Sequence, residues 1–301
     1  MEALVYYIFY VIAYLLSLIP LRALYILSDI TYPLLNHVVK YRKKIVYENL
    51  KNAFPDKTYQ ERKKIANQFY KHFCDTIFET IKLLTISKKK YYHRVTYKNP
   101  GVLTELYQKK QHAIVVVGHY GNWEWLTALP KDSPYHTMAV YKPLNNKRFD
   151  NLLIKMRSRF GTEMVPMRQT IKAINRYHEE KKYTLSCFIG DQSPVWEEVQ
   201  YWTEFLNQDT PVYLGIEKIS RKTRQAVLFY NMQKTKRGHY EVEIIKLSDD
   251  ASKTQPYEIT EKHVKLLERI IKNRPELWLW THRRWKLTKK KLEKESLKNS
   301  A

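Results

Sequence analysis

The chain has 301 residues, with 53 Lys and Arg against 30 Asp and Glu, so its formal net charge is +23 at pH 7. This length allows one large domain or two smaller ones with an ample core. The positive charge predicts an acidic partner: a nucleic acid, an anionic membrane surface, or an acidic substrate or carrier protein. The two cysteines, Cys74 and Cys187, exclude a disulfide framework and a cysteine metal cluster. We expect both to be buried apolar side chains rather than nucleophiles.

The first 39 residues predict a membrane anchor. No residue from 3 to 21 is charged, which is close to the roughly 20 apolar residues that a spanning helix needs. A cleaved signal peptide fits poorly, because a basic N-terminus and a small-residue cleavage site are missing. The basic cluster at 40–44 then places the body of the protein on the cytoplasmic side. Residues 21–39 contain Asp29 and Pro33, so they predict an interfacial or packed helix rather than a second span. For residues 3–19, a buried core helix is the alternative to an anchor.

The remainder of the chain predicts an α/β domain. Residues 41–94 favour helices with a break at 52–56. Short β-type runs then alternate with helical stretches, which is typical of a largely parallel sheet flanked by helices. We expect strands at 113–117, 137–140, 184–188, 226–230 and 241–245, and helices at 123–129, 147–160, 169–179, 212–219 and 259–271. The predicted division is therefore an anchor at 1–39, an α/β domain at 40–287 and a Lys-rich tail at 288–301.

Residues 113–125 form the most informative segment. A β-branched run predicts a buried strand, and it is followed by His119 and, five positions later, by Glu124. A histidine held by a carboxylate is a general base for a hydroxyl group or a water molecule. Residues five apart on one helix point about 140° away from each other, so contact requires a turn at 118–121 and a helix capped by Asn122. The alternative is a polar turn with a surface histidine.

A second polar pair follows another expected strand. Asp191 and Gln192 come directly after the apolar run 184–189. In a parallel sheet this loop lies at the same edge as His119, where ligands usually bind. A proline-containing turn with a local side-chain hydrogen bond is the alternative.

Two further segments carry cations. Arg157 and Arg159 are two positions apart, so on a helix one can bind a phosphate or an oxyanion while the other extends along the surface. A pair of surface arginines is the alternative. Residues 274–286 combine aromatic side chains with cations, including Arg283. This pattern predicts a membrane-facing belt, a phosphate-binding edge or a base-stacking surface.

Taken together, these segments resemble the lipid A biosynthesis acyltransferases, the late (secondary) acyltransferases of bacterial lipopolysaccharide assembly. The resemblance covers about residues 1–287. Besides the N-terminal apolar stretch, it rests on the following segments: Tyr41–Lys44 with Asn49–Leu50 and Ala53–Pro55, Gly118–Glu124, Arg157 with Arg159–Gly161, Gly190–Gln192, Thr210–Lys218, and Pro275–Trp280 with His282–Lys286.

The resemblance implies a fold similar to the glycerolipid acyltransferases, with an α/β acyltransferase domain at 40–287. It implies transfer of a fatty acyl chain from an acyl carrier protein thioester to a hydroxyl of a lipid A precursor. His119 is then the general base, and Glu124 orients it and stabilises its charged form. The implied substrate-binding residues are Arg159 as the preferred phosphate or oxyanion ligand, Arg157 as the second, and Asn122, Asp191, Gln192 and Arg283.

The same resemblance implies no metal and no cofactor beyond the thioester donor. The expected partners are acyl carrier protein, a lipid A precursor and anionic lipid of the bacterial inner membrane, all of which suit a basic protein. We do not expect nucleic acid as a partner, because the N-terminal apolar segment has no role in such a protein. The donor chain length and the acceptor position are not implied.

Three other functions stay open at this point. The first is acyl transfer to a different lipid, such as a glycerolipid or an amino-acid lipid. The second is hydrolysis, with His119 activating water. The third is a non-enzymatic, membrane-anchored basic protein that binds nucleic acid or anionic lipid; it predicts that His119→Ala leaves function intact and that binding falls steeply with salt.

Overall fold

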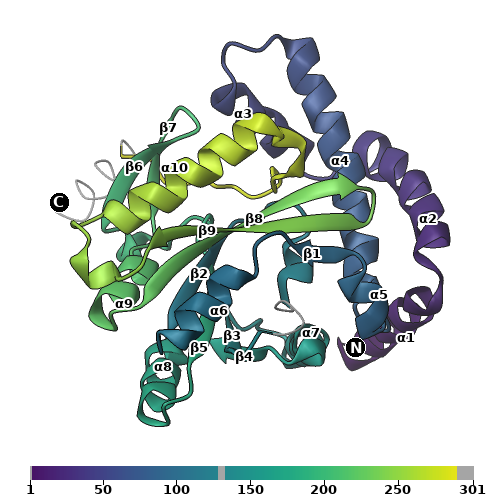
Figure 1. The fold of residues 1–301 in the computed structure, drawn as a ribbon. Coiled ribbons are helices and arrows are strands. Elements are labelled where there is room, and N and C mark those ends of the chain that lie inside the picture. The colour runs from purple at the N-terminus through teal and green to yellow at the C-terminus, as the bar shows by residue number, and fades with distance from the viewer. Residues whose placement is uncertain (1, 128–132, 290–301) are drawn as a thin grey trace.

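The computed structural model describes residues 2–127 and 133–289, and its centre is a seven-stranded sheet in the order β1-β9-β8-β2-β5-β3-β4 (Figure 1). Neighbouring strands are parallel except β8 and β9, which are antiparallel. The strands are β1 (Val95–Tyr97), β2 (Ala113–Val117), β3 (His136–Tyr141), β4 (Glu163–Pro166), β5 (Thr184–Ile189), β8 (Ala226–Lys236) and β9 (His239–Ser248). The predicted α/β fold with a mostly parallel sheet is therefore confirmed.

Strand β2 lies near the middle of the sheet and is buried along its whole length. Its side chains alternate between the two faces, as the two-residue period of a strand requires. Ala113, Val115 and Val117 belong to one hydrophobic cluster, and Ile114 and Val116 belong to the other. A strand that must pack apolar side chains on both faces explains the unbroken β-branched run.

Helices cover both faces of the sheet (Figure 1). The first cluster includes side chains from α2, α6 and α7, the second includes side chains from α3, α9 and α10, and α4 contributes to both. The α-helices are α1 (Glu2–Leu18), α2 (Leu21–Pro33), α3 (Lys43–Ala53), α4 (Tyr59–Lys82), α5 (Lys88–Tyr92), α6 (Gly101–Gln108), α7 (Lys147–Arg157), α8 (Thr170–Glu179), α9 (Gly215–Lys222) and α10 (Glu258–Asn273). Short 3-10 helices include η2 (Trp123–Thr127), η3 (Ser158–Phe160) and η7 (Pro275–Leu277).

The predicted N-terminal membrane-anchor helix is wrong. No helix within residues 2–127 and 133–289 is both long enough and apolar enough to cross a membrane. The chain breaks between α1 and α2 at residues 19 and 20, so α1 has 17 residues and is about 26 Å long, below the roughly 30 Å of a bilayer core. Residues 21–39 form α2 and the π-helix η1 (Leu34–Val38), and α2 packs against α4.

Residues 201–212 differ from the prediction as well. They form an antiparallel hairpin of β6 (Tyr201–Phe205) and β7 (Gln208–Val212) instead of leading into a helix at 212, and α9 begins at Gly215. Leu206 and Asn207, the two residues between the strands, both have positive φ angles, of 52° and 61°. Two such residues are typical of the tight turns that join hairpin strands.

Candidate active site

The sheet brings His119 and Asp191 together. Val117 at the end of β2 lies opposite Ile189 at the end of β5, and the two strands are parallel. Two residues further along each chain, His119 Nδ1 lies 2.6 Å from Asp191 Oδ1, and the backbone N–H of His119 donates to Asp191 Oδ2 at 2.8 Å. A Cβ atom at Gly118 would lie 2.8 Å from the Leu267 side chain and 3.3 Å from Asp191 Oδ2, so glycine permits this close approach.

The Asp191 carboxylate is buried and ionised. Its second oxygen also accepts a hydrogen bond from the indole N–H of Trp278 at 2.8 Å, and the residue is 7% exposed. Burial by itself raises the pKa of a carboxyl group. The charge of His119 and the hydrogen bonds from His119 and Trp278 outweigh this effect and lower the pKa of Asp191 to about 2. The Asp191 carboxylate is therefore held in its ionised form next to His119.

The C-terminal aromatic segment supports the His119 loop from its other side. Gly121 N–H donates to Leu277 O at 2.9 Å, and Leu279 N–H donates to His119 O at 3.1 Å. Trp278 and Trp280 are 2% and 0% exposed. The expectation of a membrane-facing or base-stacking surface is therefore wrong for these two tryptophans, which pack in the core beside the loop.

A cavity of about 410 Å³ opens next to His119. It runs between β3, β5, α7 and the start of α9, and most of its wall is apolar. Its polar lining includes His119, Gln192, Glu124 and Arg157, together with Lys142 and Asp150. The Gln192 side-chain amide nitrogen lies 3.1 Å from His119 Nε2. One imidazole nitrogen therefore contacts Asp191 while the other lies beside Gln192.

Glu124 lines this cavity but is not the partner of His119. Its two carboxylate oxygens accept hydrogen bonds from Arg157, at 2.6 Å from Nη2 and 2.8 Å from Nε. The Glu124 side chain is 12% exposed and the Arg157 side chain is 22% exposed. Although burial lowers the pKa of an arginine, the hydrogen bonds and charge of Glu124 outweigh this and raise the pKa of Arg157. The His119 imidazole therefore does not make the expected contact with Glu124. Its Nδ1 contacts Asp191, and its Nε2 lies beside Gln192.

The remaining predicted residues lie away from the cavity. Asn122 is 0% exposed and its side-chain amide donates to Glu79 at 2.5 Å, so it caps no α-helix; the segment after it is the 3-10 helix η2. Arg159 is exposed and its guanidinium contacts the backbone oxygen of Leu83. Arg283 is exposed as well. Arg157 is thus the arginine of the predicted pair that reaches the cavity.

The two cysteines do not provide a nucleophile. Cys74 is fully buried, and Cys187 is partly buried and contributes to the cavity wall. Burial raises the pKa of both thiols to about 12. At neutral pH both are therefore thiols, and the thiolate is the nucleophilic form.

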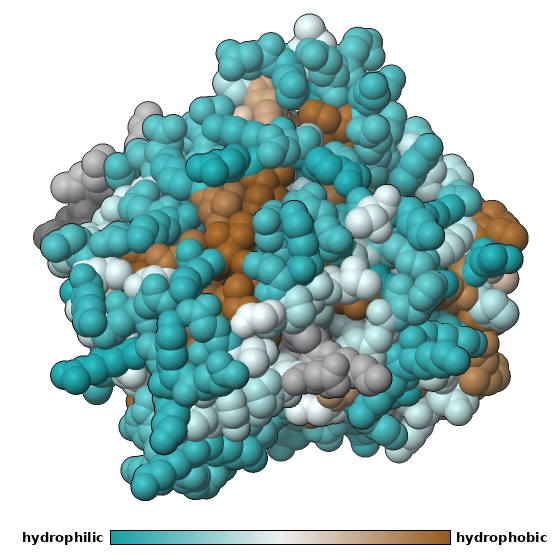
Figure 2. Space-filling view, in the orientation of Figure 1, coloured by the Kyte–Doolittle hydropathy of each residue, from teal (hydrophilic) through white to brown (hydrophobic). Residues whose placement is uncertain are grey.

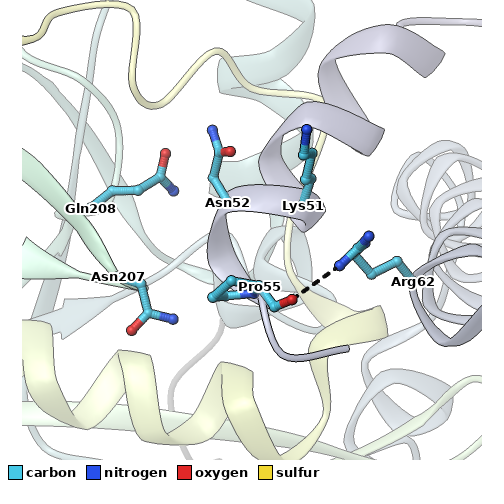
Figure 3. A pocket seen from close by; sticks show the side chains of 6 residues that line it. All are labelled: Lys51, Asn52, Pro55, Arg62, Asn207 and Gln208. Carbon is cyan, nitrogen blue, oxygen red and sulfur yellow. Dashed lines mark hydrogen bonds between the residues drawn. The ribbon is translucent and has the colours of Figure 1, made fainter. Parts of the chain in front are cut away.

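A second hollow, of about 460 Å³, lies between α3, the start of α4 and the β6–β7 turn (Figure 3). Its wall carries Lys51 and Arg62 with three amide side chains. The Arg62 guanidinium already donates to the backbone oxygens of Phe54 and Pro55, at 3.1 and 3.5 Å. This hollow is similar in volume to the His119 cavity, but it lacks a general base paired with a carboxylate, so chemistry rather than size identifies the candidate active site.

Comparison with protein families identifies a match over most of the chain. Residues 1–287 are similar to the family described as bacterial lipid A biosynthesis acyltransferase. The match includes both strand ends that carry His119 and Asp191, and it also includes the aromatic segment at 275–280. A search of curated proteins finds no match for this chain.

Proposed function

The chain belongs to the bacterial lipid A biosynthesis acyltransferase family and is therefore an acyltransferase, and from this premise we propose that it transfers a fatty acyl chain from an acyl carrier protein thioester to a hydroxyl of a lipid A precursor. The observation that carries this proposal is the His119–Asp191 pair beside a largely apolar cavity. An apolar cavity with few polar groups suits an acyl chain, and a base at its edge suits activation of a hydroxyl.

In the proposed mechanism, His119 Nδ1–H donates to Asp191, so Nε2 carries the lone pair that accepts a proton once the acceptor hydroxyl takes the place of the Gln192 amide beside it. The acceptor hydroxyl gives its proton to Nε2, and its oxygen attacks the thioester carbonyl carbon. The tetrahedral intermediate then collapses, the carbon–sulfur bond breaks, and the imidazolium returns the proton to the leaving thiolate. The ionised Asp191 stabilises the imidazolium, which is the role that the family resemblance implies for Glu124.

Gln192 and Arg157 supply the other polar contacts in this proposal. The Gln192 amide lies next to Nε2, where an N–H donor can stabilise the negative charge that develops on the carbonyl oxygen. Arg157 and Glu124 form a fixed ion pair in the cavity wall. We propose that this pair holds the acceptor. The Arg157 guanidinium is then the preferred phosphate ligand, in place of the exposed Arg159.

We place this reaction at the cytoplasmic face of the bacterial inner membrane, with attachment to the surface rather than insertion across it. On α1, exposed apolar side chains recur at three- and four-residue spacing: Leu4, Ile8, Val11, Leu15 and Leu18, each more than half exposed. Figure 2 shows hydrophobic residues at the edge of the molecule where α1 and α2 lie. An apolar helix face on a protein of charge +23 suits an anionic lipid surface, and acyl carrier protein is acidic too.

Mass spectrometry of lipid A from cells with and without the gene tests the reaction. We expect the deletion strain to lack one acyl chain, and we expect wild type, but not His119→Ala, to restore it. If lipid A is unchanged and a glycerolipid or amino-acid lipid lacks one chain, the acceptor belongs to that lipid class instead. Thioester hydrolysis that added acceptor does not reduce would indicate a hydrolase instead.

A further inference from the structure

Helix α4 carries three ionisable side chains into the core beside the active site. His72, Asp75 and Glu79 are spaced three and four residues apart, which places them on one face of the helix. They are 5%, 4% and 0% exposed, respectively. Burying such groups is costly unless each one is hydrogen-bonded or paired, so their partners indicate what the cluster holds in place.

Glu79 connects three separate parts of the chain. One carboxylate oxygen accepts a hydrogen bond from the Tyr25 hydroxyl on α2 at 2.7 Å. The other accepts from the Tyr240 hydroxyl on β9 at 2.7 Å and from the Asn122 side-chain amide at 2.5 Å. Asn122 lies three residues after His119 in the loop that leaves β2. Burial raises the pKa of Glu79, and the hydrogen bonds from Tyr240 and Tyr25 act in the opposite direction.

His72 holds the preceding residue of the same loop. Its Nε2 lies 3.1 Å from the backbone oxygen of Gly121, a residue with a positive φ angle of 63°. Burial and the nearby charge of Lys234 lower the pKa of His72 to about 3. The imidazole is therefore neutral near pH 7 and donates Nε2–H to this carbonyl.

Asp75 links His72 to helix α2. The Ser28 hydroxyl on α2 donates to Asp75 Oδ1 at 2.8 Å. The Lys234 ammonium group lies 3.2 Å from Asp75 Oδ2 and 3.4 Å from His72 Nδ1. Two hydrogen-bonded routes therefore run from α2 to the loop. One passes through Glu79, and the other passes through Asp75, Lys234 and His72.

We propose that Glu79 and His72 are positioning residues for the acyl-transfer reaction: they fix the loop that carries His119 and connect its geometry to helix α2. The inference rests on the proposed function. The loop is held by α4 on one side and by Asp191 and residues 277–279 on the other. Displacing a reacting group by about 1 Å can cost about 100-fold in rate, so loss of the α4 contacts reduces turnover even though neither residue touches the substrate.

Steady-state kinetics on the full chain test the proposal with two variants at one position. We expect Glu79→Ala to lower kcat by about 100-fold while KM changes less than about twofold, because the loop moves and the cavity remains. We expect Glu79→Gln to stay within about threefold of wild type. Its amide oxygen can accept from Asn122 and Tyr240, and its N–H can donate to the Tyr25 oxygen.

A matched pair of tyrosine variants separates positioning from general stability. Tyr25→Phe removes the hydroxyl that joins α2 to Glu79, and we expect a several-fold lower kcat. Tyr70→Phe removes a buried hydroxyl on α4 itself, which donates to Tyr41 O at 2.7 Å and does not contact the loop. We expect an unchanged kcat for Tyr70→Phe. Wild-type kcat in both Glu79→Ala and Tyr25→Phe, or equal losses in Tyr25→Phe and Tyr70→Phe, overturns the proposal; the tyrosine pair decides alone if Glu79→Ala does not fold.

The imidazole NMR signals of His119, assigned with the His119→Ala variant, provide a measurement that needs no substrate. We expect Glu79→Ala and Tyr25→Phe to shift these signals, and we expect Glu79→Gln and Tyr70→Phe to leave them in place. Unshifted signals in the first two variants overturn the positioning role. If the wild-type protein transfers no acyl chain, the proposed function fails, while these spectra still decide whether α4 fixes the loop.

Discussion

Replacing Asp191 by asparagine tests the proposed mechanism most directly, because it removes the charge beside His119 and keeps the size of the side chain. The environment lowers the pKa of Asp191 from 3.8 to about 2. This shift corresponds to about 2 kcal/mol of stabilisation of the carboxylate relative to its protonated form, or a factor of roughly 50 in the equilibrium between the two forms. An asparagine amide can also donate to Nδ1 and so move the histidine proton to Nε2. We therefore expect kcat to fall by at least about 50-fold, and by up to about 10⁴-fold if the wrong tautomer dominates.

The assay compares kcat for acyl transfer from a thioester donor to a lipid A precursor, at neutral pH and below the melting temperatures of all variants. Asp209→Asn is the matched control, since this carboxylate is 60% exposed and pairs with Lys289 at the surface. We expect the control to keep wild-type activity. An Asp191→Asn enzyme that folds and stays within about threefold of wild type would refute the assignment of Asp191 to the imidazolium.

Three further predictions concern stability. Arg157→Ala leaves the largely buried Glu124 carboxylate without its partner and should lower the free energy of unfolding by about 3 kcal/mol. Arg159→Ala at the surface should lower it by less than about 1 kcal/mol, and chemical denaturation measures both. Gly118→Ala places a Cβ against Leu267 and Asp191; it should cost about 1–3 kcal/mol of stability and lower kcat, and a normal melting temperature with full turnover would contradict this. Burial lowers the pKa of His263 from 6.5 to about 4, so the unfolded chain binds its proton first and stability falls between pH 6.5 and 4; His263→Phe should reduce that slope by about one proton in urea titrations.

The strand pattern of the chain was largely predictable. The β-branched run at 113–117 and the apolar run at 184–189 form β2 and β5 within a residue of the prediction. The polar residues after them lie at one edge, because parallel strands place their carboxyl ends together. The short strands β1 and β4 and the β6–β7 hairpin were missed. Short elements carry weak periodicity, and the hairpin turn contains Leu206 in a conformation that its residue type does not indicate.

The partner of His119 was not predictable in the same way. Proximity along the chain favoured Glu124, five residues away, whereas the structure pairs His119 with Asp191, 72 residues away. The choice depends on the register between β2 and β5, which no local pattern specifies. Glu124 finds its partner in Arg157 at the end of α7, and that contact also depends on how separate elements pack.

The N-terminus shows the same division. Composition alone identified residues 3–19 as apolar and residues 40–44 as basic, and both statements hold whatever the fold. The break between α1 and α2 falls at Pro20, which the sequence shows, whereas the packing of α2 on α4 was decided by tertiary structure.

The sequence by itself therefore determined the residue types, the charge and the two strands that precede His119 and Asp191. Tertiary structure alone decided which carboxylate holds the histidine, that Trp278 and Trp280 are buried, and that Glu79 on α4 contacts the loop. Local patterns report each element's own periodicity, while these contacts join residues that are distant in the chain and adjacent only after the sheet and its helices have packed.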